Sequence, residues 1–505
     1  RDDGYLEEYK RIALGDTVPV GHEKWFAYME YAEYCDVLQK STAESFIRHT
    51  HEVYKRRFGK ALGTEIPSIF TDEPQMRAKR PLVRATDKGA AILPYTSDLP
   101  DSFERAYGVD LLAHLPVLIW ERADGGISPI RYDYHKHITD RFSGGYIDTV
   151  GAWCAENGLK LTGHVMGEEK LETQTLYVGE AMRHYRNFDL PGVDMLCDHR
   201  ELNTVKQAQS VARQYGRAGI VSELYGVTNW DFDFRGHKLQ GDWQAALGVV
   251  QRVPHLYWAS MGGEAKRDYP ASIGHQSAWY TEYHHLEDHF ARIHTVMTRG
   301  KAEVGIAVIH PIETYWLHFG PADHTGRKRA ELDEKFEALT EWLLYSLNDF
   351  DFVCESLLPE QWRENGKGFS VGEMNYRTVI VPFMETIRSG TLDALERFRQ
   401  AGGEIIFFGG VPEYVDGVAS DRAEKLAERC IRMPWSSSVL LEHFEKEKFI
   451  EVSDATGGRV GGLVHQVRCE GENKYVFLSH IEKADPDAPE AEKLNIRFRG
   501  EWTVY

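Results

Sequence analysis

The sequence contains no apolar run of about 18 or more residues, which is the length that a membrane-spanning helix requires, and no signal peptide is visible. The missing signal peptide carries little weight, because the chain starts at Arg1 without a methionine and ends at Tyr505 inside an expected strand. The chain could therefore be a trimmed piece of a longer protein. We expect no membrane partner and leave localisation open, with the cytoplasm slightly favoured.

Cysteine is scarce and basic residues are outnumbered. The six cysteines are scattered without a C-x-x-C pair, which argues against a disulfide framework or a zinc site. Lys and Arg number 59 against 78 Asp and Glu, and the formal net charge is −19. Because phosphate binding needs a basic surface, this balance argues against a nucleic-acid partner.

Three catalytic signatures are also missing. There is no G-x-S-x-G elbow of a serine hydrolase and no H-E-x-x-H zinc motif. The segment FFGGVPEYVDG lacks the G-x-G-x-x-G spacing that binds a dinucleotide. What is present, 505 residues with 42% apolar and 27% charged residues, is typical of a globular enzyme of two or three domains.

Residues 1–300 alternate short apolar strands with amphipathic helices, the pattern that predicts a parallel sheet. Each expected strand ends in polar or small residues, where a barrel enzyme carries its catalytic groups. We predict a (β/α)8 TIM-type barrel that is either irregular or has lost its first strands upstream, because only six units can be placed. Their strand segments are 25–37, 66–74, 159–169, 192–199, 219–226 and 255–263.

Two further regions follow the predicted barrel. Residues 301–435 read as strand, helix, strand, strand, helix and strand, which predicts a small doubly wound α/β domain. Residues 436–505 alternate apolar and polar side chains and predict a β-rich domain, the incomplete start of a β-sandwich.

Two glutamates stand at matching places in this pattern. Glu73 follows the strand that ends at Phe70, within TDEP, and Glu223 follows GIVS. Hydrolysis of a glycosidic bond uses two carboxyl groups, one that protonates the leaving oxygen and one that attacks the sugar or activates water. A single acidic residue after a strand is more often a solvated loop residue or a helix N-terminal charge. Two at equivalent strand ends favour the catalytic interpretation.

Other polar residues at strand ends are candidates for substrate binding. His164 could hold a sugar hydroxyl or a carboxylate, whereas Glu168 could equally belong to the first turn of the next helix. Asp198 and His199 could bind substrate or a cation, or lie in a surface loop. Trp230 and Asp231 follow Glu223 and could offer a ring face and a carboxylate, although Trp230 could also pack in the core. His255, Tyr257 and Arg267 are weaker candidates.

The motifs IFTDEPQ, LTGHVMGEE and VSELYGVTNWDF, with YCDVLQKSTAESFIRHTHEVYKRRFG ahead of them, resemble the α-L-rhamnosidases of glycoside hydrolase family 106 over most of residues 20–320. The order of domains is also similar to family 42 β-galactosidases, in which a flavodoxin-like domain follows the barrel. This resemblance implies that Glu73 ends strand four as the acid, and that Glu223 ends strand seven as the second carboxylate.

The two families imply different chemistries. Family 106 enzymes invert the anomeric configuration and depend on calcium, whereas family 42 enzymes retain it. Such barrels carry Asn before the strand-four glutamate, but this chain has Asp72, which leaves a sugar contact, a cation contact or a part in the acid machinery open. A cofactor is not certain, and calcium is possible.

The sequence therefore predicts an exo-acting glycosidase that is α-L-rhamnosidase-like and acts on a carbohydrate or glycoconjugate. Two alternatives stay open. One is a retaining β-galactosidase-like glycosidase of the family 42 type, and the other is a carbohydrate-binding scaffold without turnover, because a barrel does not itself imply catalysis. Self-association through the doubly wound domain is possible.

Overall fold

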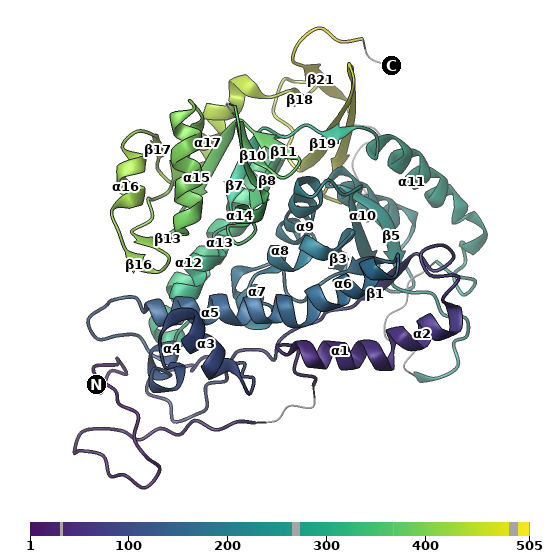
Figure 1. Ribbon diagram of the computed structural model, residues 1–505. Coiled ribbons are helices and arrows are strands. Elements are labelled where there is room, and N and C mark those ends of the chain that lie inside the picture. Colours follow the sequence, from purple (N-terminus) through teal and green to yellow (C-terminus); the bar gives the residue numbers. More distant parts are fainter. Residues whose placement is uncertain (31–33, 265–272, 367, 484–492, 504–505) are drawn as a thin grey trace.

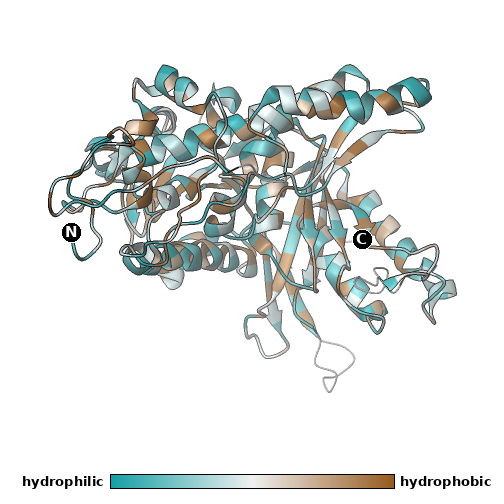
Figure 2. Ribbon diagram, turned by 90° about the horizontal axis from the view of Figure 1, so that it is seen from below, coloured by the Kyte–Doolittle hydropathy of each residue, from teal (hydrophilic) through white to brown (hydrophobic). Residues whose placement is uncertain are grey.

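The computed structural model describes residues 1–30, 34–264, 273–366, 368–483 and 493–503. The chain forms a mixed α/β structure with two parallel sheets and two small antiparallel sheets near the C-terminus. Figure 1 shows the N-terminal sheet and its helices in blue and teal, beside the green second sheet. Figure 2 shows hydrophobic residues concentrated along the central strands.

The first sheet has five parallel strands in the order β1-β2-β3-β4-β5. Neighbours in the sheet are also neighbours in sequence, as expected when each strand is followed by a crossover helix. Its strands are β1 (Ser68–Thr71), β2 (Lys160–Gly163), β3 (Leu190–Met195), β4 (Ile220–Leu224) and β5 (Val249–Pro254).

Helices cover this sheet. The Ser128 hydroxyl caps the start of α5 by accepting a hydrogen bond from the Arg131 amide, and Pro129 takes the first position of that helix. Asp233 caps the start of α10 by accepting from the amides of Arg235 and Gly236. The larger helices are α1 (Lys40–His49), α2 (His51–Phe58), α3 (Leu99–Tyr107), α5 (Pro129–Phe142), α6 (Asp148–Glu156), α9 (Leu202–Gln214), α10 (Phe234–Ala246) and α11 (His284–Met297). Shorter ones are α4 (Pro116–Ile119), α7 (Leu171–Tyr177) and α8 (Ala181–His184).

Two strand predictions were wrong. Within 25–30 and 34–37, the described part of the first predicted unit, there is neither helix nor strand, and the aromatic residues Trp25, Phe26 and Tyr28 are exposed. The last strand is Val249–Pro254, not 255–263, because the β-branched residues precede His255. The described residues of the first region thus form a sheet of five parallel strands, fewer than the eight of a closed barrel.

The second parallel sheet has the order β17-β14-β12-β7-β8. Counted along the chain from its β8 edge, this is 2-1-3-4-5, one of the two common orders of doubly wound sheets. Its strands are β7 (Ile306–Ile309), β8 (Phe350–Val353), β12 (Thr378–Pro382), β14 (Glu404–Phe408) and β17 (Ile431–Met433). Its helices are α12 (Ile312–Leu317), α13 (Ala322–Tyr345), α14 (Leu358–Gln361), α15 (Ser389–Gln400) and α16 (Arg422–Ala427). Two small sheets flank it, β9 (Trp362–Asn365), β10 (Gly368–Val371) and β11 (Met374–Tyr376), then β13 (Thr386–Ile387), β15 (Tyr414–Val415) and β16 (Val418–Ala419).

Helix α9 joins the two parallel sheets, because it contacts both β3 and β8 and all 13 of its residues are buried. Its cations meet acids from the second sheet. Arg213 Nη1 lies 2.9 Å from Asp351 Oδ1, and Lys206 Nζ lies 2.8 Å from Asp349 Oδ1. Buried charges persist where they are paired, so this cluster fixes one domain against the other.

The C-terminal region begins with α17 (Ser437–Phe444) and continues as two antiparallel sheets. One pairs β18 (Ile450–Asp454) with β21 (Leu494–Phe498), and the other joins β19 (Leu463–Glu470), β20 (Asn473–His480) and β6 (Lys301–Ala302). The predicted boundary at 301 therefore needs a correction, since β6 pairs with the C-terminal region. None of the helices in the described ranges has the length and apolar character that a bilayer span requires.

Candidate active site

The carboxyl ends of three parallel strands bring the main candidate residues together. Asp72 and Glu73 follow β1, His164 follows β2, and Glu223 lies on β4 one residue before its end. Parallel strands place their carboxyl ends at one edge of the sheet, so residues far apart in sequence become neighbours there. This edge therefore holds the candidate active site.

A glycine allows β1 and β2 to approach closely at this edge. Gly163 has a φ of 121°, and a Cβ atom there would lie 2.0 Å from the carbonyl oxygen of Thr71. The next residue, His164, donates its backbone N–H to the same carbonyl at 3.2 Å. The T-G-H sequence thus places the imidazole of His164 beside the turn that carries Asp72 and Glu73.

The imidazole of His164 lies between two carboxylates. Its Nε2 atom is 3.0 Å from Glu223 Oε2 and 3.6 Å from Asp72 Oδ1. The His164 side chain is 1% exposed and that of Glu223 is 15% exposed, whereas that of Asp72 is 72% exposed. The pair His164–Glu223 therefore forms the floor of the site, and Asp72 stands at its solvent side.

The protonation states of the two glutamates are driven apart. Burial raises the pKa of Glu73, and the neighbouring charges of Asp72 and Glu223 raise it further. Burial alone would also raise the pKa of Glu223, but the hydrogen bond and the charge of His164 outweigh it and lower that pKa below its usual value. Opposite shifts of this kind separate a general acid from a base.

His164 is held in its charged form. Burial opposes the charge, but the hydrogen bond to Glu223 and the nearby carboxyls of Glu168 and Asp194 raise the pKa of His164 to about 9. A protonated imidazole donates from both nitrogens. We therefore assign Nε2 as the donor to Glu223, which keeps the Glu223 carboxylate ionised.

Asp194 is a site residue that our sequence reasoning missed. It lies on β3 in register with Glu223 on β4, and its Oδ1 is buried without a hydrogen-bond partner among the described residues. Burial and the charges of Glu223 and Glu73 raise the pKa of Asp194 to about 6. An acidic residue inside the apolar strand GVDM was the available signal.

Two aromatic rings lie next to the carboxyls. Phe70 was not foreseen as a site residue, whereas His255 was one of the weaker candidates. Phe70 on β1 is 38% exposed although its strand reads as core, and its ring meets that of His164 edge-on at 5.6 Å. His255 lies directly after β5, with Nε2 3.7 Å from Glu223 Oε1. These residues provide an apolar surface and a second imidazole beside Glu223.

Glu168 is buried behind the site and does not line its surface. Tyr185 donates its hydroxyl to Glu168 Oε1 at 2.9 Å, and the backbone carbonyl of Glu168 accepts from Gln174 and Gln207. Burial raises the pKa of Glu168 to about 8. In the structure the side chain of Glu168 contacts the protein interior, and a contact of Glu168 with substrate stays a prediction.

The remaining candidates make other contacts. Asp198 Oδ2 lies 2.8 Å from Lys483 Nζ, so this carboxylate is already paired, and His199 is exposed.

Trp230 is 38% exposed and Asp231 is exposed, in the loop between β4 and α10. Tyr257 donates to or accepts from His275 Nδ1 at 2.9 Å. Arg267 lies outside the described residues.

The donor set at the strand ends suits calcium only in part. Ligand atoms of Asp72, His164 and Glu223 lie within 4.8 Å of one another. Calcium takes oxygen ligands, but the third group here is an imidazole that carries a proton and binds Glu223. Asp198, a possible cation ligand in the sequence, is paired with Lys483, so these carboxylates do not form an oxygen cage for calcium.

Comparison with known proteins gives one family over most of the chain. The model of glycoside hydrolase family 106, described as alpha-L-rhamnosidase, matches residues 27–458. A solved rhamnosidase from Novosphingobium sp. PP1Y aligns with a TM-score of 0.66 and 17% identity, covering 92% of this chain and 43% of that one. An exo-carrageenase of family GH42 from Bacteroides ovatus aligns with a TM-score of 0.56 and 10% identity, covering 84% of this chain and 60% of that one.

A curated protein from Formosa agariphila, whose name assigns it provisionally to the beta-glucuronidases, is 21% identical over 329 residues. The match covers 62% of this chain and 25% of that protein. The chain thus spans about a quarter of this curated relative and less than half of the solved rhamnosidase.

Proposed function

Because the chain belongs to the family of α-L-rhamnosidases, whose model matches most of its length, we propose that it is an exo-acting glycoside hydrolase that removes a terminal α-L-rhamnosyl residue. The observation that carries this proposal is the pair Glu73 and Glu223. They stand at the carboxyl ends of two strands of one sheet, and their pKa values are shifted in opposite directions. This is what an acid and a base need in order to act together at neutral pH.

Glu73 is the general acid in this proposal. Its raised pKa favours the protonated form, which can give a proton to the glycosidic oxygen as the bond from that oxygen to the anomeric carbon breaks. Ionised Glu223 takes a proton from water, and the water oxygen forms the new bond to the anomeric carbon. The products are the free sugar and the alcohol, and both glutamates then return to their starting states by proton exchange with solvent.

We place His164 as a positioning residue in this reaction. Its 3.0 Å contact fixes the orientation of the Glu223 carboxylate and keeps it ionised. Asp194 offers an unpartnered carboxylate oxygen and Phe70 an exposed ring at the same edge. A polyhydroxylated ring with one apolar face would satisfy both groups. Trp230, Asp231 and Tyr257 remain proposed substrate contacts from the loops around the site.

No step of this mechanism uses a metal, because the residues do not form an oxygen cage. Calcium dependence remains a proposal that rests on the family, and dialysis against EDTA tests it. Loss of activity that added calcium restores would support it, and full activity after EDTA would exclude it.

The two parallel sheets support two proposals about the fold. We propose that the five strands of the first sheet represent strands four to eight of a (β/α)8 barrel, supported by their unbroken order and by the strand ends that carry the glutamates. We propose a flavodoxin-like domain for residues 301–435, supported by the 2-1-3-4-5 strand order. The start of a β-sandwich at 436–505 and self-association also remain proposals.

The experiment that tests the function is a panel of p-nitrophenyl glycosides that includes α-L-rhamnoside and β-D-galactoside. The purified chain is compared with Glu73→Gln. Release from the rhamnoside that disappears in the variant supports the proposal. Release from the galactoside instead would favour the family 42 reading, and silence with measurable sugar binding would favour a non-catalytic scaffold.

A further inference from the structure

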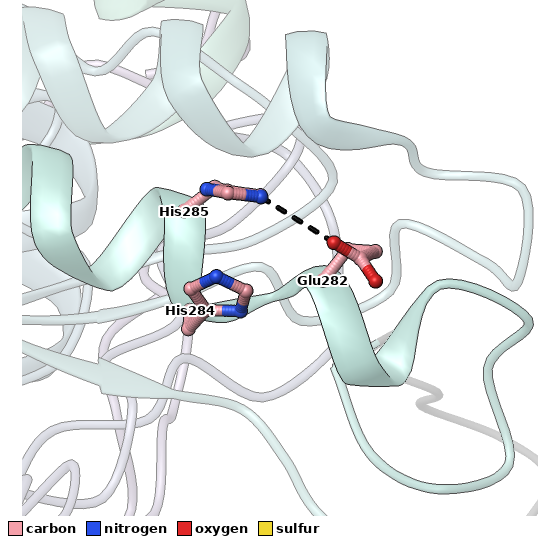
Figure 3. Close-up of side chains that lie close together, drawn as sticks. All are labelled: Glu282, His284 and His285. Carbon is pink, nitrogen blue, oxygen red and sulfur yellow. Dashed lines mark ion pairs between the residues drawn. The ribbon is translucent and has the colours of Figure 1, made fainter.

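Three metal-ligating side chains converge at the start of helix α11, outside the strand-end site (Figure 3). Glu282 is the last residue of the 3-10 turn Tyr280–Glu282, and His284 and His285 are the first two residues of α11. One ligand atom from each lies within 4.8 Å of the other two. The proposed reaction gives these residues no role.

The side chains are arranged around one point. His285 Nε2 lies 3.3 Å from Glu282 Oε2, and the rings of His284 and His285 are 4.0 Å apart with an interplanar angle of 40°. Neutral imidazole and carboxylate are the groups that bind a transition metal.

A backbone contact orients one of the imidazoles. Nδ1 of His284 lies 3.0 Å from the carbonyl oxygen of Thr281. The Nδ1–H group donates to that oxygen, so in the neutral ring the lone pair is on Nε2. Histidines that bind metals are typically held in this way, with the second ring nitrogen bonded to a carbonyl or carboxylate.

The ligands stand on a rigid support. Tyr283, between Glu282 and His284, has helical φ and ψ of −62° and −23°, so the turn passes into α11 without a break. The opposite face of α11 is packed, with Leu286 and Phe290 buried and the guanidinium of Arg252 3.8 Å from the Phe290 ring centroid. The three donors therefore need little rearrangement to bind an ion.

From these observations we propose that Glu282, His284 and His285 form a surface site for a divalent transition metal of the zinc type. Two imidazole nitrogens and one carboxylate oxygen make a mixed set that zinc, nickel and copper accept, whereas calcium and magnesium prefer oxygen alone. The exposed position leaves the fourth coordination place open to water. The bound ion would tie the turn before α11 to the helix itself.

This proposal is independent of the glycosidase activity, and metal binding alone tests it. The full chain, freed of metal and of any polyhistidine tag, is titrated with Zn²⁺ by calorimetry. The double variant His284→Ala, His285→Ala should bind one equivalent fewer than the wild type. Glu282→Gln should weaken zinc affinity at this site. The loss should be at least the roughly 10-fold to 100-fold that follows from removing a residue hydrogen-bonded to a metal ligand.

The matched control is His49→Ala, which removes an exposed histidine from the last turn of α1 and should bind zinc like the wild type. Circular dichroism verifies that each variant is folded, as expected for exposed positions. Equal zinc stoichiometry in the wild type and the double variant overturns the proposal. A visible Co²⁺ spectrum that the double variant lacks gives a second, independent readout.

Discussion

Nε2 of His164 lies 3.0 Å from Oε2 of Glu223, and this contact joins the ends of β2 and β4. The imidazole stabilises the negative charge of Glu223 and lowers its pKa, while burial and like charges raise the pKa of Glu73. One histidine thus makes two chemically identical side chains different. The first two predictions depend on this asymmetry.

Replacing either glutamate by glutamine should abolish most of the turnover. Glu73→Gln removes the proton donor and Glu223→Gln removes the base, and each loss should lower kcat by about 10²-fold to 10⁴-fold. The measurement is kcat on the glycoside that the wild type hydrolyses, with folding verified by circular dichroism. A variant with nearly wild-type kcat would remove that residue from the mechanism.

Removing the imidazole should move the whole pH profile. In His164→Ala the pKa of Glu223 rises, because Glu223 loses its hydrogen bond and its cationic neighbour. The pKa of Glu73 also rises, because the charge of His164 lowers it in the wild type and is absent from the variant. The base must be ionised and the acid protonated, so both limbs of the bell-shaped kcat/KM profile should shift to higher pH.

The control for this shift is His49→Ala, an exposed histidine of α1, whose profile should match the wild type. A His164→Ala profile that is lower in height but unchanged in both limbs would show that His164 only supports the fold. A shift of one limb alone would assign His164 to one glutamate and not to both.

Hydrolysis should invert the anomeric configuration, as family membership suggests. Inversion requires room for a water molecule, with carboxyl groups about 6.5–9.5 Å apart, whereas retention uses about 5–5.5 Å. Proton NMR during the first turnovers distinguishes the two outcomes, because the initial product anomer appears before mutarotation. A first-formed product with the configuration of the substrate would contradict inversion.

The residues at strand ends were predictable because the sequence signal for them is local. Short apolar runs that end in TDEP, TGH and SEL place Glu73, His164 and Glu223 at one edge once the strands are parallel. Their pairing needs only the period of the pattern and the handedness of the crossovers. The 3.0 Å contact between His164 and Glu223 could not be predicted from that order, because β3 lies between β2 and β4 and the side chains must reach across it.

The wrong or missed predictions lie where contacts between distant parts of the chain determine the structure. Residues 25–30 are rich in aromatic residues and read as a strand, yet the described part of this segment has neither helix nor strand. Asp194 escaped notice because it lies inside a strand and not after one, and only the register with Glu223 shows that it faces the site. Asp198 lies three residues beyond the end of β3, and Lys483, 285 positions later in the sequence, pairs with it.

The buried carboxyl of Glu168 should give the protein a distinctive pH dependence of stability. Burial raises the pKa of Glu168 to about 8 in the folded chain, compared with an ordinary value of 4.5. Between these values the folded protein holds a proton that the unfolded chain has released. Stability therefore falls as pH rises through this window, by up to about 1.4 kcal/mol per pH unit from this group.

Glu168→Gln should lose that slope, because the amide is neutral at every pH and still offers an oxygen to the Tyr185 hydroxyl. Urea unfolding of both proteins at several pH values between 5 and 8 measures the difference, which should grow in favour of the variant as pH rises. The control Glu156→Gln, at an exposed position in α6, should show the wild-type slope. Parallel curves for the wild type and Glu168→Gln would mean that Glu168 is ionised in the folded protein. The positive charge of His164, which opposes the rise in pKa, would then dominate over burial.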